Sequence, residues 1–251
     1  MTLRSILLTA AITLGGAAAF AAQAGTFRVH AYGVDAPVVS RLRADLVWAE
    51  RHIRDTLGEF PDTVGVRVHG SRDAFTGALR DELGIEETAC WMVGAAGDHT
   101  VHLLSPDVWA EQACEHDARD TEHVRMLVTH EAVHVFHGQL NPAPDLGRLE
   151  EIGWFTEGLA TYVSGQLAAR HAGRAAAALE SGPGPARLVD AWSGPDRYGV
   201  AGSMIAFIDD AWEPGTLQRL LRATSQQEIL DELGTSEAAF LADWRRWVRS
   251  R

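Results

Sequence analysis

Lysine is absent from the sequence. All 22 basic residues are arginine, and 34 Asp and Glu residues give the chain a formal net charge of −12. Because binding to nucleic acid depends on clustered positive charge, this balance argues against a nucleic-acid partner. The sequence also lacks internal repeats, low-complexity linkers and any long apolar run after the first 24 residues. With 46% hydrophobic and 22% charged residues in 251 positions, it is typical of a globular protein of one or two domains.

The N-terminus has the pattern of a secretory signal peptide. Arg4 supplies positive charge, residues 6–22 are apolar or small, and Ala22-Gln23-Ala24 fits an A-x-A cleavage site. We predict a signal peptide at 1–24, export to the periplasm or the medium, and no stable membrane insertion after cleavage. An uncleaved anchor is the alternative, although the stretch is near the lower length limit for a spanning helix.

Only two cysteines occur, Cys90 and Cys114. In an oxidising compartment an even pair favours a disulfide, which here would contribute about 3 kcal/mol of stability. Two buried free thiols are the alternative.

Hydrophobic periodicity predicts an α+β fold with strands first and helices afterwards. The strands are expected at 27–32, 64–69, 90–93 and 100–104, with a turn at 94–98. The helices are expected at 37–57, 72–83, 120–137, 153–171, 198–212, 217–223, 226–233 and 236–249. We predict a small, mostly antiparallel sheet within residues 25–119, packed on the helix that follows it. Residues 120–251 would supply that helix and a helical C-terminal lobe.

The segment His130-Glu131-Ala132-Val133-His134 is an HExxH motif on a predicted helix. Residues i and i+4 lie one turn apart on the same face, so both imidazoles can reach one metal ion at about 2.0–2.1 Å. Glu131 is rotated away from them, yet it can approach a water on the metal, whose pKa falls toward about 7. The apolar flanks predict a buried helix, in which these polar groups are costly unless paired or bound to metal.

Glu157 lies 23 residues after His134, on the next predicted helix. A catalytic zinc takes three protein ligands and keeps one open position, and two His with one Glu is a known set. A turn at 141–145 lets the chain reverse, so that the second helix can present Glu157, and Gly158 permits close helix packing. An ordinary surface glutamate is the alternative, which the apolar surroundings disfavour.

HEAVH followed by W-F-x-E-G-L-A-x-Y resembles the gluzincins, the thermolysin-like zinc peptidases, and most nearly their small bacterial peptidase MA-like families. The resemblance covers roughly residues 100–247. It implies a thermolysin-like zincin fold, a peptide or protein substrate and one zinc ion per chain. It also implies the following roles: metal ligands His130, His134 and Glu157, and catalytic base Glu131.

By the same resemblance, Tyr198 would donate a hydrogen bond to the oxyanion of the reaction intermediate; a structural tyrosine at a helix start is the alternative. His137, one turn beyond the motif, is either a spare ligand or a polar contact. His99 and His102 would face substrate if the strand at 100–104 borders the cleft, and are structural otherwise.

The sequence also departs from related patterns. A metzincin would have Gly and His where His137 and Leu140 stand, so that class is excluded. Gluzincin aminopeptidases carry a Gly-x-Met-Glu-Asn strand that anchors the substrate's amino terminus. Residues 94–98 read Gly-Ala-Ala-Gly-Asp and do not match it, which puts exopeptidase activity of that kind in doubt.

Three functions remain open at this point. The first is an exported zinc metallopeptidase, in which Glu131 deprotonates the attacking water and later protonates the leaving nitrogen. The second is a non-catalytic, zinc-stabilised domain that binds a peptide or a partner. The third is a zinc amidohydrolase that acts on a non-peptide amide. The presence of Glu131 favours catalysis, since a purely structural metal site needs no base.

Overall fold

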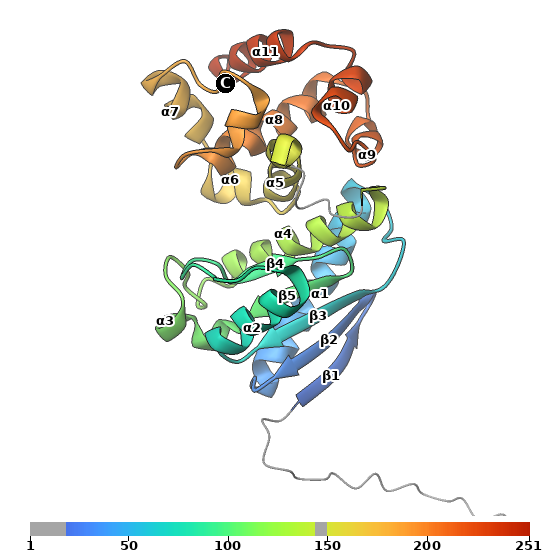
Figure 1. Ribbon diagram of the computed structural model, residues 1–251, viewed down its shortest axis with the longest axis vertical. Coiled ribbons are helices and arrows are strands. Elements are labelled where there is room, and N and C mark those ends of the chain that lie inside the picture. The colour runs from blue at the N-terminus through green and yellow to red at the C-terminus, as the bar shows by residue number, and fades with distance from the viewer. Residues whose placement is uncertain (1–18, 144–149) are drawn as a thin grey trace, which may run out of the picture.

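A computed structural model describes residues 19–143 and 150–251. Most of the predicted signal peptide, residues 1–18, lies outside the described residues, as does the second half of the turn expected at 141–145. The described chain is built in two layers around a central helix, with a sheet and its helices on one side and a helical lobe on the other (Figure 1). No helix in the described part has the length and apolarity needed to cross a bilayer.

The sheet layer contains five strands and three α-helices. In chain order its elements are β1 (Ala19–Ala24), β2 (Phe27–Tyr32), α1 (Ala36–Thr56), β3 (Val64–His69), α2 (Arg72–Leu83), β4 (Gly94–Ala96), β5 (Thr100–Leu104), the 3-10 turn Pro106–Val108 and α3 (Trp109–Gln112). The long connections through α1 and α2 return the chain to the same end of the sheet, as parallel pairing requires.

The strand order is β1-β2-β3-β5-β4. The pairs β2–β3 and β3–β5 are parallel, and the outer pairs β1–β2 and β5–β4 are antiparallel. The fold is α+β as predicted, but the expectation of a mostly antiparallel sheet was wrong. The predicted strand at 90–93 was wrong as well, because the strand that pairs with β5 is Gly94–Ala96, inside the expected turn.

Strand β1 consists of residues that belong to the predicted signal peptide. Ala19 to Ala24 pair antiparallel with Tyr32 to Phe27 of β2. Cleavage after Ala24 stays a prediction, and it would remove β1 and leave β2 at the edge of the sheet.

The helical layer follows the central helix α4 (Thr121–Leu140). Its elements are the 3-10 turn Glu150–Ile152, α5 (Gly153–Val163), α6 (Gln166–Arg170), α7 (Arg174–Ser181), the 3-10 turn Leu188–Trp192, α8 (Arg197–Ala211), α9 (Thr216–Leu220), α10 (Gln226–Leu233) and α11 (Glu237–Arg249). The single helix expected at 153–171 is two helices, because Gly165 between them has φ +83°, a left-handed conformation that glycine adopts without strain.

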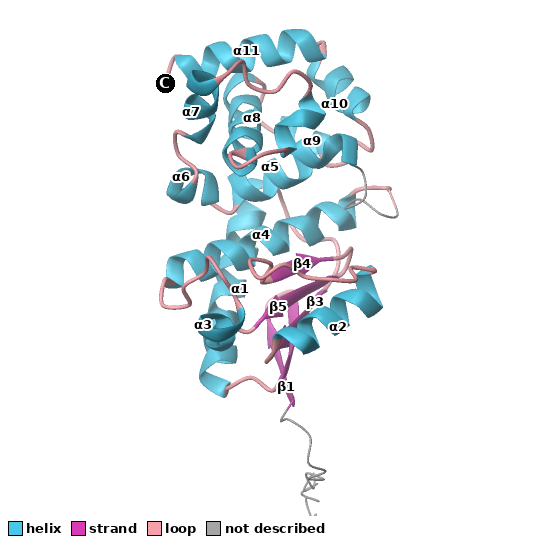
Figure 2. Cartoon of the chain, turned by 60° about the vertical axis from the view of Figure 1, so that its left-hand side comes forward, coloured by secondary structure: helices cyan, strands magenta, loops and turns pink. Residues whose placement is uncertain are grey.

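Helix α4 lies between the two layers in both views (Figures 1 and 2). Asp120 caps it by accepting a hydrogen bond from the His123 backbone N–H, as an N-cap aspartate does. The helix is apolar around most of its circumference, and residues from Val124 to Phe136 are buried on the sides that face the sheet and the lobe. A helix with this pattern holds several polar side chains inside the protein, and His130 and Glu131 of the HExxH motif are among them.

Cys90 and Cys114 form a disulfide, with their Cα atoms 5.3 Å apart. The prediction of a disulfide is confirmed. It joins the segment before β4 to the segment after α3, and no free cysteine remains.

Helices α5 and α8 approach each other closely at Gly158. A Cβ atom added there would lie 2.6 Å from the Ala201 carbonyl oxygen, which is a backbone atom that cannot move aside. We expect Gly158→Ala to force the helices apart and to destabilise the fold by about 2 kcal/mol or more.

The matched control is Gly77→Ala in helix α2, where an added Cβ has no atom within 4 Å. Alanine is the better helix former, so this change should be neutral or stabilising by up to about 1 kcal/mol. Denaturant unfolding measures both free energies. Equal values for the two variants would contradict the packing role of Gly158.

Candidate metal centre

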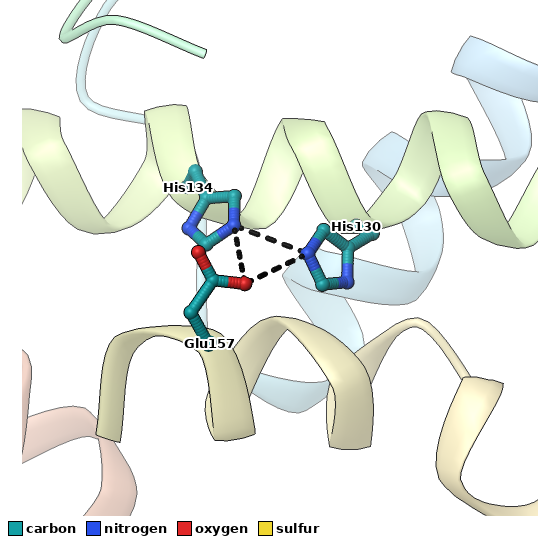
Figure 3. A group of neighbouring side chains, drawn as sticks. All are labelled: His130, His134 and Glu157. Carbon is teal, nitrogen blue, oxygen red and sulfur yellow. Dashed lines mark hydrogen bonds and ion pairs between the residues drawn. The ribbon is translucent and has the colours of Figure 1, made fainter. Parts of the chain in front are cut away.

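His130 and His134 lie one turn apart on α4 and turn their Nε2 atoms toward Glu157 of α5 (Figure 3). The two Nε2 atoms are 3.2 Å apart, and the Glu157 Oε2 atom lies 3.4 Å from His130 Nε2 and 3.7 Å from His134 Nε2. These three residues are the one group of His, Cys, Asp or Glu in the described chain whose ligand atoms converge within 4.8 Å. The structure therefore brings the three predicted ligands together.

The local sequence explains how α5 presents Glu157. Trp154, Phe155 and Leu159 are fully buried and fix the helix against its neighbours. Phe155 packs edge-on against the ring of His137 on α4, with centroids 5.7 Å apart. Glu157 is left in the space between the helices with 27% of its side chain exposed.

Charge is balanced within this group. Burial alone would raise the pKa of Glu157, but the nearby His134 and His130 outweigh it and lower that pKa below its usual range. Burial disfavours the charged form of His134, yet the carboxylates of Glu157 and Glu131 outweigh it and raise its pKa. A carboxylate that stays ionised beside two imidazoles matches the donor set of a catalytic zinc site, with three protein ligands and room for a fourth.

Glu131 lies at the same place but in a different environment. It is buried, and burial is the main reason that its pKa is raised. The backbone of β4 covers it so closely that a Cβ on Gly94 would lie 2.6 Å from its Oε1 atom. Glycine is needed at position 94 because any side chain would collide with the carboxylate.

His130, His134 and Glu157, which we call the metal-ligand group, line a cavity of about 690 Å³ together with Glu131. Its other walls are the β4 segment, the residues before it, the first turn of α8 and the 3-10 turn before α8. Those residues include Met92, Ala95, Asp98, Trp192 and Arg197. A cavity of this size holds several residues of an extended peptide or a small molecule.

Tyr198, in the first turn of α8, faces this cavity. Its ring lies 6.3 Å from that of His130, and it packs between His171 at 5.3 Å and Trp192 at 4.8 Å. Burial and the charge of Glu157 raise the pKa of Tyr198, and the neighbouring Arg197 opposes them. The phenol therefore keeps its proton and is a hydrogen-bond donor at the cavity wall.

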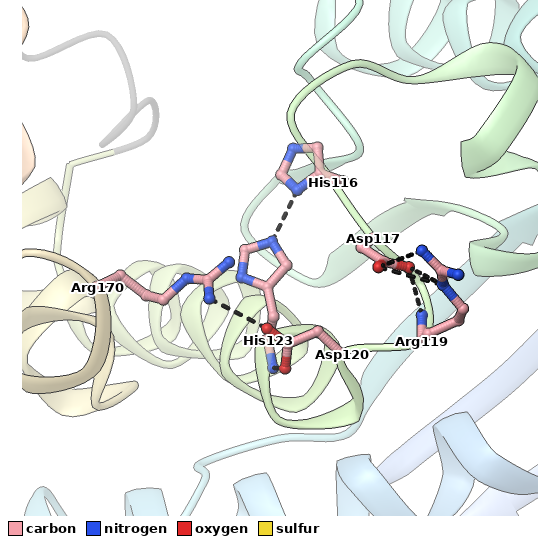
Figure 4. A network of polar contacts seen from close by, with 6 residues as sticks. All are labelled: His116, Asp117, Arg119, Asp120, His123 and Arg170. Atoms are coloured by element: carbon pink, nitrogen blue, oxygen red, sulfur yellow. Dashed lines mark hydrogen bonds and ion pairs between the residues drawn. The ribbon is translucent and has the colours of Figure 1, made fainter.

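A second polar network holds the wall next to the start of α4 (Figure 4). His116 Nε2 lies 2.7 Å from the Trp91 carbonyl oxygen, so this nitrogen carries the proton. His116 Nδ1 then accepts a 2.8 Å hydrogen bond from His123 Nε2. Burial lowers the pKa of His123 to about 4, so the pair is neutral near pH 7. This network fixes the backbone at Trp91 on the rim of the cavity.

Other sequence hypotheses have different outcomes. His102 is fully buried on β5 against His69, with their nitrogens 3.3 Å apart, and it does not line the cavity. His99 is exposed and does not line the cavity either. His137 packs on Phe155 away from the ligand group, and burial lowers its pKa to about 3. Sequence reasoning missed β4 and Arg197, because neither carries a motif.

No protein-family model and no curated protein matches the chain. Among solved structures, it is similar to an M1 zinc metallopeptidase from Deinococcus radiodurans, with 15% identity and a TM-score of 0.52, over 91% of this chain and 50% of that one. It is also similar to a two-domain M1 zinc metallopeptidase mutant bound to L-arginine, with 16% identity and a TM-score of 0.53, over 93% of this chain and 52% of that one.

These similarities show the fold, which this chain shares with about half of each of these zinc metallopeptidases. At this identity they show no more than the fold. The chain spans about half the length of the structures that it matches.

The metal site predicts a zinc stoichiometry. The purified protein should bind one zinc ion per chain, and Glu157→Gln should weaken binding roughly 100-fold or more, since even the outer partners of a zinc ligand are worth 10- to 100-fold. Zinc content after dialysis and a competitive chelator titration measure both.

His99→Ala is the control, since His99 is exposed and outside the ligand group, and it should leave zinc binding unchanged. Zinc affinity in Glu157→Gln equal to that of the parent protein would show that Glu157 is not a ligand.

Proposed function

We propose that this chain is a zinc metallopeptidase that hydrolyses peptide bonds, with Glu131 as its general base. The observation that supports this most directly is the position of Glu131, which shares one cavity with the His130, His134 and Glu157 group. The fold similarity to zinc metallopeptidases is in accord with it.

The environment of Glu131 suits a base. Zinc, when bound, supplies a water of lowered pKa and polarises the scissile carbonyl. Burial raises the pKa of Glu131, so its carboxylate is a better proton acceptor than a solvated one. The same carboxyl group then delivers the proton to the leaving nitrogen.

Strand β4 gives the substrate a place to bind. It is the last strand of the sheet order, so its outer edge has no strand partner among the described residues, and its three residues line the cavity. An extended peptide can add to such an edge through main-chain hydrogen bonds. Gly94 and the small side chains of Ala95 and Ala96 leave room for it beside Glu131.

Tyr198 is suited to stabilise the oxyanion. Its phenol is protonated, faces the cavity, and has its ring 6.3 Å from that of His130. A donor in that position acts on negative charge that develops during the reaction, where it is most effective.

Two other functions make different use of this site. A non-catalytic zinc domain does not need Glu131, whose buried carboxylate has no hydrogen-bond partner among the described residues. A non-peptide amide would undergo the same chemistry, but the free edge of β4 favours a peptide backbone.

We also propose export from the cytoplasm. The signal-peptide pattern supports it, and so does the disulfide between Cys90 and Cys114, since disulfides persist in oxidising compartments. The N-terminal residue of the exported protein would distinguish cleavage after Ala24, which removes β1, from retention of that strand.

Glu131→Gln tests the proposed chemistry. The amide cannot take a proton from water, so cleavage of quenched fluorescent peptides should fall roughly 10²- to 10⁴-fold. Zinc content should stay at the parent level, since Glu131 is not in the ligand group. Cleavage at the parent rate would sink the assignment of Glu131, and a parent protein that binds zinc but cleaves no peptide would favour a binding domain or a non-peptide amide.

Tyr198→Phe tests the oxyanion donor. Loss of one such donor should lower kcat roughly 10²- to 10³-fold while KM changes little. Tyr162→Phe is the control, because the Tyr162 hydroxyl donates a 2.6 Å hydrogen bond to Asp209 and does not line the cavity. A kcat for Tyr198→Phe as high as that of the control would assign Tyr198 a packing role.

A further inference from the structure

Arg197 is the one arginine among the described residues that line the cavity. Its guanidinium carbon lies 5.7 Å from the ring centre of Trp91, 5.3 Å from that of Trp192 and 5.2 Å from that of Tyr198. Three rings from different segments therefore restrict where the guanidinium can move. An arginine held in this way has lost much of its side-chain freedom before any ligand arrives.

No described carboxylate lies within ion-pair distance of Arg197. By contrast, Arg174 pairs with Asp196, the residue before Arg197, and Arg187 pairs with Asp190. The Nε atom of Arg197 is buried and has no hydrogen-bond acceptor in the described chain. In a protein of net charge −12, an arginine on a cavity wall without an acidic partner is a candidate receptor for an anion.

The direction of β4 places Arg197 at one end of the cleft. Gly94 lies against Glu131, and Asp98 lies against Gly138, two turns further along α4. The strand thus runs past the metal-ligand group toward Asp98, while Trp91, which contacts Arg197, precedes Gly94 on the opposite side. The cleft has a cationic, aromatic end at Arg197, and Asp98 lies beyond the other end of β4.

The charge of Arg197 orients a bound peptide. A chain that pairs antiparallel with β4 has its amino-terminal side at the Asp98 end and its carboxyl-terminal side at the Arg197 end. A parallel chain would instead have its amino-terminal side, which carries the positive charge of the terminus, at the Arg197 end. Electrostatic complementarity selects the antiparallel direction, which places the leaving-group side of the scissile bond beside Arg197.

We propose that Arg197 is a specificity-determining residue that binds a substrate carboxylate on the leaving-group side of the scissile bond. The carboxylate belongs either to an acidic side chain or to the C-terminus of a short peptide. A guanidinium matches a carboxylate in shape and charge, and the rings of Trp91 and Trp192 hold this one in place for such a contact. This proposal rests on the proposed peptidase function and narrows its substrate class.

The test uses matched fluorescent peptides that differ only on the leaving-group side. One pair has a free or an amidated C-terminus, and the other has Asp or Asn at the same position. For the zinc-loaded protein, kcat/KM should be roughly 10- to 100-fold higher for one acidic member than for its neutral partner, and Arg197→Gln should bring that ratio close to one. The pair that shows the preference identifies the source of the carboxylate.

Arg249→Gln is the control, since Arg249 is exposed at the C-terminal end of α11, and it should keep the parent ratio. If Arg197 acted only through Tyr198, Arg197→Gln would lower kcat equally for every peptide and leave the ratio unchanged, which overturns the proposal. Arg197→Lys keeps the charge but loses the planar donor pair, and it should give an intermediate ratio even if the glutamine variant folds poorly.

Binding separates this proposal from the peptidase function. In the Glu131→Gln background, fluorescence anisotropy measures peptide affinity without cleavage, and the acidic peptides should bind more tightly only when Arg197 is present. If the parent protein cleaves no peptide, the peptidase proposal fails while the binding ratio still decides the role of Arg197. Equal affinity for acidic and neutral peptides overturns that role.

Discussion

The gathering of four largely buried ionisable side chains at a single point is the constraint on which the rest of this structure depends. His130, Glu131, His134 and Glu157 share the space between α4, α5 and β4, where an unpaired charge costs several kcal/mol. The protein treats the two carboxylates differently. Glu157 is paired with both imidazoles and its pKa is lowered, whereas Glu131 is mainly desolvated and its pKa is raised. Two acids with pKa values pushed apart can serve as an anionic ligand and as a base.

This arrangement requires unusually close approach of backbone segments. Gly94 lets β4 reach Glu131, Gly138 lets Asp98 reach α4, and Gly158 lets α5 reach α8. Each of these glycines lies beside a residue of the cleft or of the metal-ligand group. The small residues on β4 and α5 are therefore explained by the site, since larger side chains would improve the burial of apolar surface but would separate the segments that carry the polar groups.

The sequence predicts those parts of the site that depend on local geometry. The histidine pair follows from i, i+4 spacing, and Ser71 and Asp120, at the starts of two predicted helices, each accept a backbone N–H hydrogen bond as caps do. Glu157 needed the added support of a family resemblance, because its contact with α4 is not local. Strand β4 was missed since a three-residue Gly-Ala-Ala segment has neither alternation nor β-branched residues, and only its pairing with β5 makes it a strand.

Other errors have the same origin. Strand direction is set by where α1 and α2 return the chain, so the parallel pairs were not visible in strand patterns. His102 was a candidate for the cleft because it lies on the strand next to it, yet its side chain points to the buried side with His69. Alternation states which residues share a face of a strand, but not which face borders a cavity.

The residues that surround the cleft are held by attachments remote from the metal-ligand group. The segment with Trp91 is joined to Cys114 by the disulfide at Cys90, and Arg72 donates hydrogen bonds to the Cys90 and Met92 carbonyl oxygens. His116 holds the Trp91 carbonyl from the other side. A segment without regular secondary structure can sample many conformations, and fixing its backbone costs about 1–2 kcal/mol of conformational entropy per residue. Its covalent and hydrogen-bonded attachments limit that freedom, so Trp91 keeps its contact with Arg197 and the cationic end of the cleft has a fixed shape.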